Sequence, residues 1–283
     1  MAIQPEKLRA HRFPRARQHY VERDAILYAL GAGLGRDPVS AFDLAFLDET
    51  HLSVLPTFAV TLASPGMWIR DPQFGVDFGK LVHAGQSATF HAPLPPSDEV
   101  DSTARIVALT DRGEGRGAML VLEREIASAT TGTLYCTLQQ TLLLRGDGGF
   151  GGPPAPRPTS IVPDRTGDVS FGFDTSPRAA LIYRLSGDRN PLHIDPDTAR
   201  SAGFERPIMH GLGSYAMAAA ELCRHLGIAP ARLRSFACKF AGIVIPGDRI
   251  TLDVWRSDSD CIFTGKVGDR IVLDQGQAIW ADE

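Results

Sequence analysis

The 283-residue sequence has few cysteines and no long hydrophobic segment, and both absences limit what it can encode. Its four cysteines, Cys136, Cys223, Cys238 and Cys261, are widely spaced and form no Cys-x-x-Cys pair, which argues against a zinc ribbon or a disulfide framework. No apolar run approaches the ~18 residues that cross a bilayer, and the first 17 residues lack the apolar core of a signal peptide. We therefore expect a soluble, cytoplasmic protein that does not contact a membrane.

The sequence also lacks an excess of positive charge. It has 29 lysines and arginines against 33 aspartates and glutamates, so its formal net charge is -4. Binding to a nucleic acid depends on neutralising many phosphates, and we expect no nucleic-acid partner. The length allows one large domain or two domains of ordinary size, each with its own core.

Glycine and proline are concentrated in one segment, between Arg145 and Pro163, which can form neither a helix nor a central strand. We take this segment as a linker between two domains. The sequence therefore predicts an N-terminal domain over residues 1–150, a linker over 151–165 and a C-terminal domain over 166–283.

The two predicted domains contain similar short segments in the same order. The matching residues are Tyr28 and Tyr183, Pro56 and Pro207, and Pro95 and Pro246. The first pair is 155 positions apart (183 − 28), and each of the other two is 151 apart (207 − 56 and 246 − 95). This nearly constant offset indicates two copies of one structural unit.

Each copy is predicted to contain a helix followed by antiparallel strands. Residues 211 to 226 keep the three- and four-residue apolar spacing of a helix with one buried face. Ile250, Leu252 and Val254 alternate with more polar residues, which indicates a strand, and two further strands are expected over residues 261–267 and 270–280. Residues 104–144 show the same plan. We expect an α+β fold in which an antiparallel sheet wraps around a central helix, twice.

A short helix is predicted just before the most reactive segment of the chain. Thr175 or Ser176 would cap its start, and Pro177 would lie in its first turn. Gly187 and the Asn190-Pro191 pair would end the helix and force the chain into a turn.

Asp188, Asn190 and His193 lie on this predicted turn, where their side chains can converge. A carboxylate and an imidazole that reach one water molecule can divide the acid and base roles needed to add water to an activated alkene. The same three residues could instead form only an Asx-type turn with a helix-capping histidine, and the segment alone leaves that interpretation open.

Gly211 begins the long predicted helix, directly after His210. The first amides of a helix have no internal acceptor and carry the positive end of its dipole. A thioester carbonyl becomes enolate-like when water attacks the neighbouring carbon, and such an amide would stabilise the negative charge on its oxygen. Gly211 could equally serve only to allow tight packing at the helix start.

The two copies differ at these positions. Subtracting the offsets places Gly33, Gly35 and Pro38 opposite Asp188, Asn190 and His193, and Val60 opposite Gly211. None of the first three can transfer a proton, and the branched valine would crowd a ligand that approaches the backbone. We therefore expect one site per polypeptide, with the first copy housing the acyl chain of the substrate.

Two other motifs resemble cofactor or metal sites only in part. The glycine-rich stretch from Gly31 to Gly35 follows a predicted helix rather than a strand, which argues against dinucleotide binding. The spacing of His193, Asp195 and His210 fits no common metal site, and Asp195-Pro196 is typical of a helix start. We expect neither a metal nor a cofactor.

The segment from Tyr183 to His193, followed by His210-Gly211, closely resembles the signature of MaoC-like hydratases. The whole chain resembles the type 2 (R)-specific enoyl-CoA hydratases. Further similar stretches are Ile26 to Gly31, Leu55 to Phe58, Pro93 to Pro95 and Gly148 to Gly152. The resemblance implies a double hot dog fold, a hydro-lyase of fatty-acid metabolism or β-oxidation, and a homodimer.

The resemblance also implies roles for the residues of the turn. Asp188 and His193 would activate water for syn addition to a trans-2-enoyl-CoA, with Asn190 orienting these groups and the Gly211 amide holding the thioester oxygen. The product would be a (3R)-3-hydroxyacyl-CoA, and CoA would be part of the substrate. Relatives often have His-Gly-Glu-Gln where this chain has His83-Ala84-Gly85-Gln86, which places the shape of the acyl pocket in question.

Two alternatives stay open from the sequence. The same residues could dehydrate a 3-hydroxyacyl thioester on another carrier or a branched substrate, because hydration is reversible. The chain could also be a non-catalytic acyl-CoA-binding hot dog protein, although a binder would not need Asp188, Asn190 and His193 together.

Overall fold

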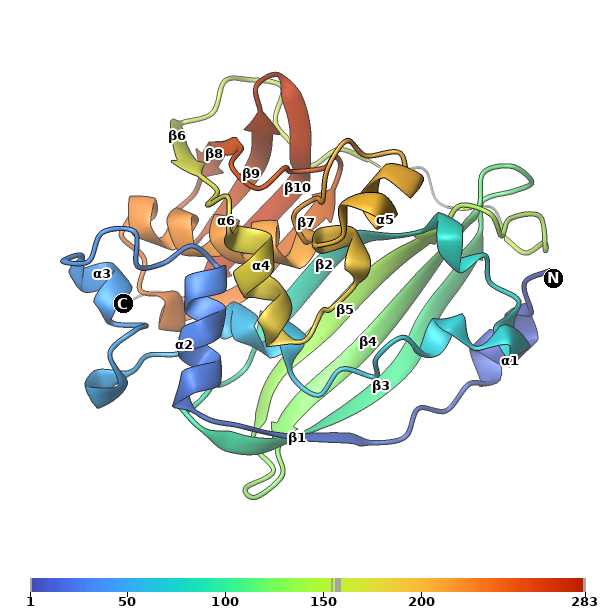
Figure 1. Cartoon of the computed structure of the whole chain (residues 1–283), viewed down its shortest axis with the longest axis horizontal. Coiled ribbons are helices and arrows are strands. Elements are labelled where there is room, and N and C mark those ends of the chain that lie inside the picture. Colours follow the sequence, from blue (N-terminus) through green and yellow to red (C-terminus); the bar gives the residue numbers. More distant parts are fainter. Residues whose placement is uncertain (1, 154, 156–158, 282–283) are drawn as a thin grey trace.

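Ten antiparallel strands form one continuous sheet in the computed structural model, which describes residues 2–153, 155 and 159–281 (Figure 1). In spatial order the strands are β1 (Ala16–Tyr20), β3 (Asp98–Asp111), β4 (Ala118–Ser128), β5 (Leu134–Leu144), β2 (Leu81–Phe90), β7 (Leu233–Phe240), β10 (Arg270–Trp280), β9 (Asp260–Val267), β8 (Arg249–Arg256) and β6 (Val169–Asp174). The three strands predicted near the C-terminus are β8, β9 and β10. Ile250, Leu252 and Val254 of β8 are buried, as their alternation predicted.

The order of the strands is symmetric about the middle of the sheet. The series β1-β3-β4-β5-β2 on one side corresponds to β6-β8-β9-β10-β7 on the other. The two series meet where β2 pairs with β7, in a register that places Ser87 opposite Ala237. These two residues are 150 positions apart (237 − 87), close to the offset between the repeated segments. The predicted duplication and the α+β double hot dog class are therefore confirmed.

Two helices, one from each half, pack directly against each other. They are α2 (Glu22–Gly31) and α4 (Ala179–Tyr183). The rings of Tyr28 and Tyr183, the residues of the first sequence repeat, have centroids 5.8 Å apart. A Cβ on Gly31 would lie 3.1 Å from the Cα of Tyr183, so this glycine permits the close approach of the two helices.

The predicted long helix is confirmed as α6 (Gly211–Leu226), which is buried along most of its length and contacts β2 and β7. Small residues such as Ala216 and Ala219 are buried and leave room for neighbouring elements to come close to the helix. In the first half, the segment opened by Pro56 forms only the short 3-10 helix η2 (Pro56–Thr61). The branched residues Thr57, Val60 and Thr61 have low helix propensity, which is consistent with the short 3-10 form.

Arg124 of β4 fixes this short helix in place. Its guanidinium donates hydrogen bonds to the carbonyl oxygens of Val60 and Leu62, both at 2.8 Å. Burial lowers the pKa of Arg124 to about 10. The first half thus uses a buried cation to satisfy carbonyl groups that a longer helix would satisfy internally.

The other helical segments are short. They are α1 (Pro5–Ala10), α3 (Ala41–Leu44), α5 (Pro196–Ser201) and the 3-10 helices η1 (Glu49–His51), η3 (Trp68–Arg70), η4 (Pro72–Phe74), η5 (Phe78–Lys80), η6 (Arg184–Ser186), η7 (Pro191–His193) and η8 (Pro230–Arg232). In the described ranges, no helix is long and apolar enough to cross a membrane.

One predicted helix start is wrong. Helix α4 begins at Ala179, with Arg178 rather than Thr175 or Ser176 at its cap position, so Pro177 precedes the helix. The hydroxyl of Thr175 instead donates to the carbonyl oxygen of Asp248 at 2.8 Å. A distant part of the chain uses this side chain, which the local sequence pattern cannot reveal.

The segment predicted as a linker follows a loop that is anchored to the end of β3. The Asp111 carboxylate accepts hydrogen bonds from the amides of Gly113, Gly149 and Gly151 at 2.7, 2.8 and 2.6 Å. The described residues of the predicted linker form neither helix nor strand, and residues 154 and 156–158 lie outside the described ranges. The division at residues 1–150, 151–165 and 166–283 stays a prediction.

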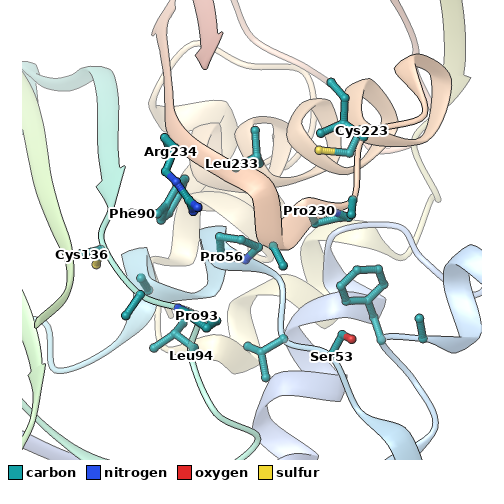
Figure 2. Close-up of a pocket in the computed structure, with 18 of the residues that line it drawn as sticks. Ser53, Pro56, Phe90, Pro93, Leu94, Cys136, Cys223, Pro230, Leu233 and Arg234 are labelled. Atoms are coloured by element: carbon teal, nitrogen blue, oxygen red, sulfur yellow. The ribbon is translucent and has the colours of Figure 1, made fainter. Parts of the chain in front are cut away.

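A cavity of about 510 Å³ lies at the C-terminal end of α6, between elements of both halves (Figure 2). Its walls come from α3 and the segment before η2, from the ends of β2 and β5, and from the loop and strand that follow α6. Phe42, Phe46, Phe90 and Leu94 are among its apolar walls.

Candidate active site

The segment between η6 and η7 is held by the side chains that the sequence singled out. Gly187 ends η6 with a φ of 124°, a conformation that disfavours any residue with a Cβ. Asp188 Oδ1 accepts a hydrogen bond from the amide of Asn190 at 3.1 Å, and Asn190 Oδ1 accepts one from the amide of Leu192 at 3.2 Å. The Asx-type turn that the sequence left open is therefore present, and it positions Asp188 and His193.

A second segment, just before α6, fixes the tautomer of His193. The Nδ1–H of His193 donates to the carbonyl oxygen of Ile208 at 2.9 Å, which places the proton on Nδ1 and leaves Nε2 as an acceptor. The amide of Met209 donates to the carbonyl oxygen of Val244 at 2.7 Å. The His193 ring is thus anchored to the chain that leads into the long helix.

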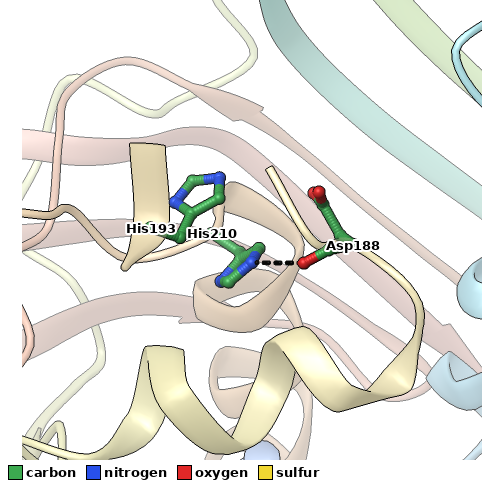
Figure 3. A group of neighbouring side chains, drawn as sticks. All are labelled: Asp188, His193 and His210. Carbon is green, nitrogen blue, oxygen red and sulfur yellow. Dashed lines mark hydrogen bonds between the residues drawn. The ribbon is translucent and has the colours of Figure 1, made fainter. Parts of the chain in front are cut away.

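His210 connects the turn to the start of α6. Its Nε2–H donates to the backbone carbonyl oxygen of Asp188 at 3.1 Å, and its ring stacks on the ring of His193 with centroids 3.7 Å apart. Potential ligand atoms of Asp188, His193 and His210 all lie within 4.8 Å of one another. In Figure 3, the Asp188 carboxylate and the His193 ring lie on the same side of His210. The structure therefore brings Asp188 and His193 together, next to the N-terminus of α6.

The role of His210 was missed in the sequence, where it was weighed only as a metal ligand. Its position immediately before Gly211, at the cap of the long helix, was the signal that could have identified it. Its Nδ1 is buried and has no hydrogen-bond partner in the described part of the chain.

Asp188, His193 and His210 each offer one possible metal-ligand atom, but the backbone already holds both histidine rings. One nitrogen of each histidine is already hydrogen-bonded to a carbonyl oxygen. Asp195 caps α5 instead, as predicted, and accepts hydrogen bonds from the Asp197 amide and the Thr198 hydroxyl at 3.0 and 2.7 Å.

Burial keeps the two stacked histidines neutral. It lowers the pKa of His193, against the opposing effects of the Ile208 hydrogen bond and the Asp188 charge. Burial and the neighbouring His193 lower the pKa of His210 to about 4. A neutral His193 with a free Nε2 can accept a proton from water.

The start of α6 faces this cluster. The amides of Gly213 and Ser214 donate to the carbonyl oxygen of His210 at 3.0 and 3.1 Å, whereas the amides of Gly211 and Leu212 have no acceptor among the described residues. A Cβ on Gly211 would lie 3.1 Å from the ring of Phe240. Glycine thus avoids a tight contact with Phe240 here, and the donation of its amide to a ligand stays a prediction.

The first half also contributes to the surroundings of the site. The register of β2 against β5 shifts between His83 and Gly85, and such bulges redirect side chains. The ring of His83 lies edge-on to Phe240, with centroids 5.0 Å apart. Burial lowers the pKa of His83 to about 4, although the nearby charge of Asp188 acts in the opposite direction. The sequence had flagged this stretch only for its missing acidic residue.

Comparison with known proteins assigns each half to a related family model. The MaoC like domain matches residues 159–275, and the MFE-2 hydratase 2 N-terminal domain matches residues 18–146. The first match contains Asp188, His193 and Gly211, and the second contains His83.

Two relatives are similar over nearly the whole chain. The 3-hydroxyacyl-thioester dehydratase Y of Mycobacterium tuberculosis is 37% identical over 290 residues, which cover 98% of each chain. The peroxisomal enoyl-CoA hydratase 2 of Arabidopsis thaliana is 35% identical over 282 residues, which cover 93% of this chain and 90% of the relative.

Solved structures share the fold. A MaoC-like dehydratase from Phytophthora capsici superposes with a TM-score of 0.85 at 27% identity, over 99% of this chain and 100% of that chain. A Mycobacterium tuberculosis protein described as having a double hotdog fold superposes with a TM-score of 0.52 at 14% identity, over 94% of this chain and 93% of that chain. The chain therefore belongs to the MaoC-like dehydratase family of hydro-lyases, as a type 2 enoyl-CoA hydratase.

Proposed function

We propose that the protein catalyses the reversible syn hydration of a trans-2-enoyl-CoA to a (3R)-3-hydroxyacyl-CoA, with Asp188 and His193 acting on the water. The observation that carries this proposal is the placement of a carboxylate and a neutral imidazole beside the start of α6. The Arabidopsis relative, named enoyl-CoA hydratase 2, supports the choice of substrate class.

In this mechanism, a water molecule donates hydrogen bonds to the Asp188 carboxylate and to Nε2 of His193. His193 removes a proton as the water oxygen forms a bond to C3 of the enoyl group. The imidazolium then returns that proton to C2 on the same face, which completes a syn addition without any other reactant. The hydrogen bond from Nδ1 to Ile208 holds the ring in the tautomer that this step requires.

Negative charge develops on the thioester oxygen while C3 is attacked. We assign its stabilisation to the amide of Gly211, which lies at the positive end of the α6 dipole. Asn190 acts on the turn itself, because its side-chain oxygen caps η7 and thereby orients His193. The proposed chemistry needs neither a metal nor a cofactor beyond the CoA of the substrate.

The acyl chain is proposed to extend into the first half of the molecule. There the counterpart of α6 is only the short helix η2. The residues of the first half that correspond to Asp188, Asn190 and His193 are two glycines and a proline, which cannot transfer protons. The molecule would then have one reaction site per chain.

Substitution of Asp188 tests the proposal directly. Asp188→Asn keeps the size of the side chain but removes its charge, and it should lower the rate of crotonyl-CoA hydration by about 10²- to 10⁴-fold, the usual contribution of an acid–base group. Asp197→Asn, at an exposed aspartate on α5, is the matched control and should keep full activity. The loss of enoyl absorbance measures the rate, and chiral analysis of the product identifies its configuration.

An inactive wild-type protein that still binds crotonyl-CoA would instead favour the acyl-CoA-binding alternative. Dehydration of a 3-hydroxyacyl thioester on another carrier is the second enzymatic candidate; the Mycobacterium tuberculosis relative is named a 3-hydroxyacyl-thioester dehydratase, a name that specifies no carrier. Comparing the reaction rates for the same acyl group on CoA and on acyl carrier protein distinguishes the two enzymatic candidates.

A homodimeric state and a cytoplasmic location stay proposals. Light scattering coupled to size-exclusion chromatography measures the oligomeric state. Cell fractionation measures the location, and because the Arabidopsis relative is named as peroxisomal, a peroxisomal location is the competing expectation.

A further inference from the structure

The cavity of Figure 2 lies far from the proposed reaction site. Its lining includes Cys223 and Gly227, at the end of α6, and none of Asp188, His193 and His210. Gly211 and Cys223 are twelve residue steps apart on α6, which corresponds to roughly 18 Å of helix. The cavity is therefore a separate feature of the molecule.

The shape of the cavity is held by a buried ion pair between the two halves. Asp43 of α3 is 1% exposed, and its carboxylate accepts hydrogen bonds from the Arg224 guanidinium at 2.5 Å and from the Gly35 amide at 2.9 Å. This pair ties α3, which contains Phe42 and is followed closely by Phe46, to the end of α6. Because the wall is fixed in this way, the cavity is formed before any ligand enters.

The charged residues that line the cavity are two arginines, and no aspartate or glutamate is among its lining residues. The charge of Arg224 is balanced by Asp43 and by Glu221, whose carboxylate lies 3.2 Å from it. Arg234 has no hydrogen bond or ion pair with any residue in the described ranges. In Figure 2, its side chain extends from β7 past Phe90 toward Pro56.

We propose that this cavity binds an aliphatic chain that ends in a carboxylate, with the chain between the apolar walls and the carboxylate on Arg234. An apolar chain gains free energy when its surface leaves water, and a guanidinium offers a carboxylate two parallel N–H donors. Two ligands share this chemistry: a free fatty acid, and the far end of a dicarboxylic acyl-CoA. The second case rests on the proposed hydratase function, and the first does not.

Binding of decanoate and of decan-1-ol, measured by calorimetry on the full chain, tests the proposal. The wild type should bind decanoate more tightly than the alcohol. Arg234→Gln should weaken decanoate binding about tenfold, the effect of losing one charge-assisted hydrogen bond, and should leave alcohol binding unchanged. Arg234→Lys should restore part of the difference, and Arg112→Gln, at an exposed arginine outside the cavity, should have no effect.

A second variant tests the location of the ligand. Ala231 lines the cavity and is exposed, so Ala231→Trp can narrow the cavity without disturbing the core. It should weaken the binding of both decanoate and decan-1-ol. Equal binding of the acid and the alcohol, or an Arg234→Gln variant that binds decanoate as the wild type does, would overturn the proposal.

Kinetics distinguish the two sources of the ligand. If decanoate competes with a long-chain enoyl-CoA but not with crotonyl-CoA, the cavity receives the far end of the substrate, and Arg234→Gln should then raise KM for a dicarboxylic enoyl-CoA. If decanoate competes with neither, the ligand is a free fatty acid. Calorimetry needs no turnover, so a failure of the hydratase proposal leaves the binding result interpretable.

Discussion

The burial of His83, His193 and His210 determines which protonation states the site can offer. Each has a pKa below the ordinary value of 6.5, and those of His83 and His210 fall to about 4, because a charged imidazole is disfavoured where water is excluded. A base must be unprotonated to accept a proton from water. The site is thus arranged to keep its imidazole groups neutral under mildly acidic conditions.

The pH dependence of hydration follows from this arrangement. Protonation of His193 removes the base, and because its pKa is lowered, we expect the acidic decline of kcat/KM to be centred below pH 6.5. An acidic limb centred above pH 6.5 would contradict the assignment of His193 as a buried base. The unfolded chain regains ordinary histidine pKa values, so stability also falls as the pH drops from 6.5 toward 4. Circular dichroism at each pH serves as the control.

Arg124 is a second residue whose burial has a measurable consequence. Arg124→Met removes both donors to the carbonyl oxygens of Val60 and Leu62, and each buried oxygen left without a donor costs about 1–3 kcal/mol. We expect a loss of roughly 3 kcal/mol in the free energy of unfolding, measured by urea denaturation. Arg105→Met, at an exposed arginine on β3 in the residue pair next to that of Arg124, should change stability by less than about 1 kcal/mol.

Among the secondary-structure elements, α6 has the most constrained start. Gly211→Ala would add a Cβ 3.1 Å from the ring of Phe240, and one of the two must move by a few tenths of an ångström. Because the Gly211 amide is proposed to face the thioester oxygen, kcat should fall about tenfold while stability changes by less than about 1 kcal/mol. Steady-state kinetics measure kcat, and urea denaturation measures the free energy of unfolding.

A double substitution provides the control for this experiment. Phe240→Leu removes the ring that the new methyl group meets, so the Gly211→Ala/Phe240→Leu variant should recover part of kcat. A Gly211→Ala variant with full activity would show that the position of this amide does not affect catalysis.

Elements with their own apolar pattern were predictable from the sequence. The helix at Gly211–Leu226 and the strand at Arg249–Arg256 bury the faces that their spacing indicated. The start of α4 was not predictable, because Thr175 bonds to Asp248, 73 residues away. Nor was the anchoring of η2 by Arg124, whose guanidinium comes from β4, far away in the sequence.

The same distinction holds for the candidate site. Asp188, Asn190 and His193 lie within six residues, and a turn brings them together from local sequence alone. The stacking of His210 on His193 and the approach of His83 to Phe240 depend on contacts between separate elements. Spacing along the chain carries no information about such contacts.

At the scale of the whole molecule, the two halves are joined by pairing between β2 and β7 and by the Asp43–Arg224 ion pair. Asp43→Asn removes the charge that balances a partly buried guanidinium, which should lower the free energy of unfolding by roughly 3 kcal/mol. Urea denaturation measures the effect. Asp197→Asn, which affects only an exposed pair with Arg200, is the control and should be nearly neutral.

The meeting of β2 and β7 inside one polypeptide has a consequence for how the protein can change. Where two identical chains assemble through such a pair of strands, every substitution appears in both chains. Here each substitution appears once, so one half can lose its long helix and its proton-transferring groups while the other keeps them. Covalent fusion thus lets one half specialise in holding a ligand without damaging the chemistry of its neighbour.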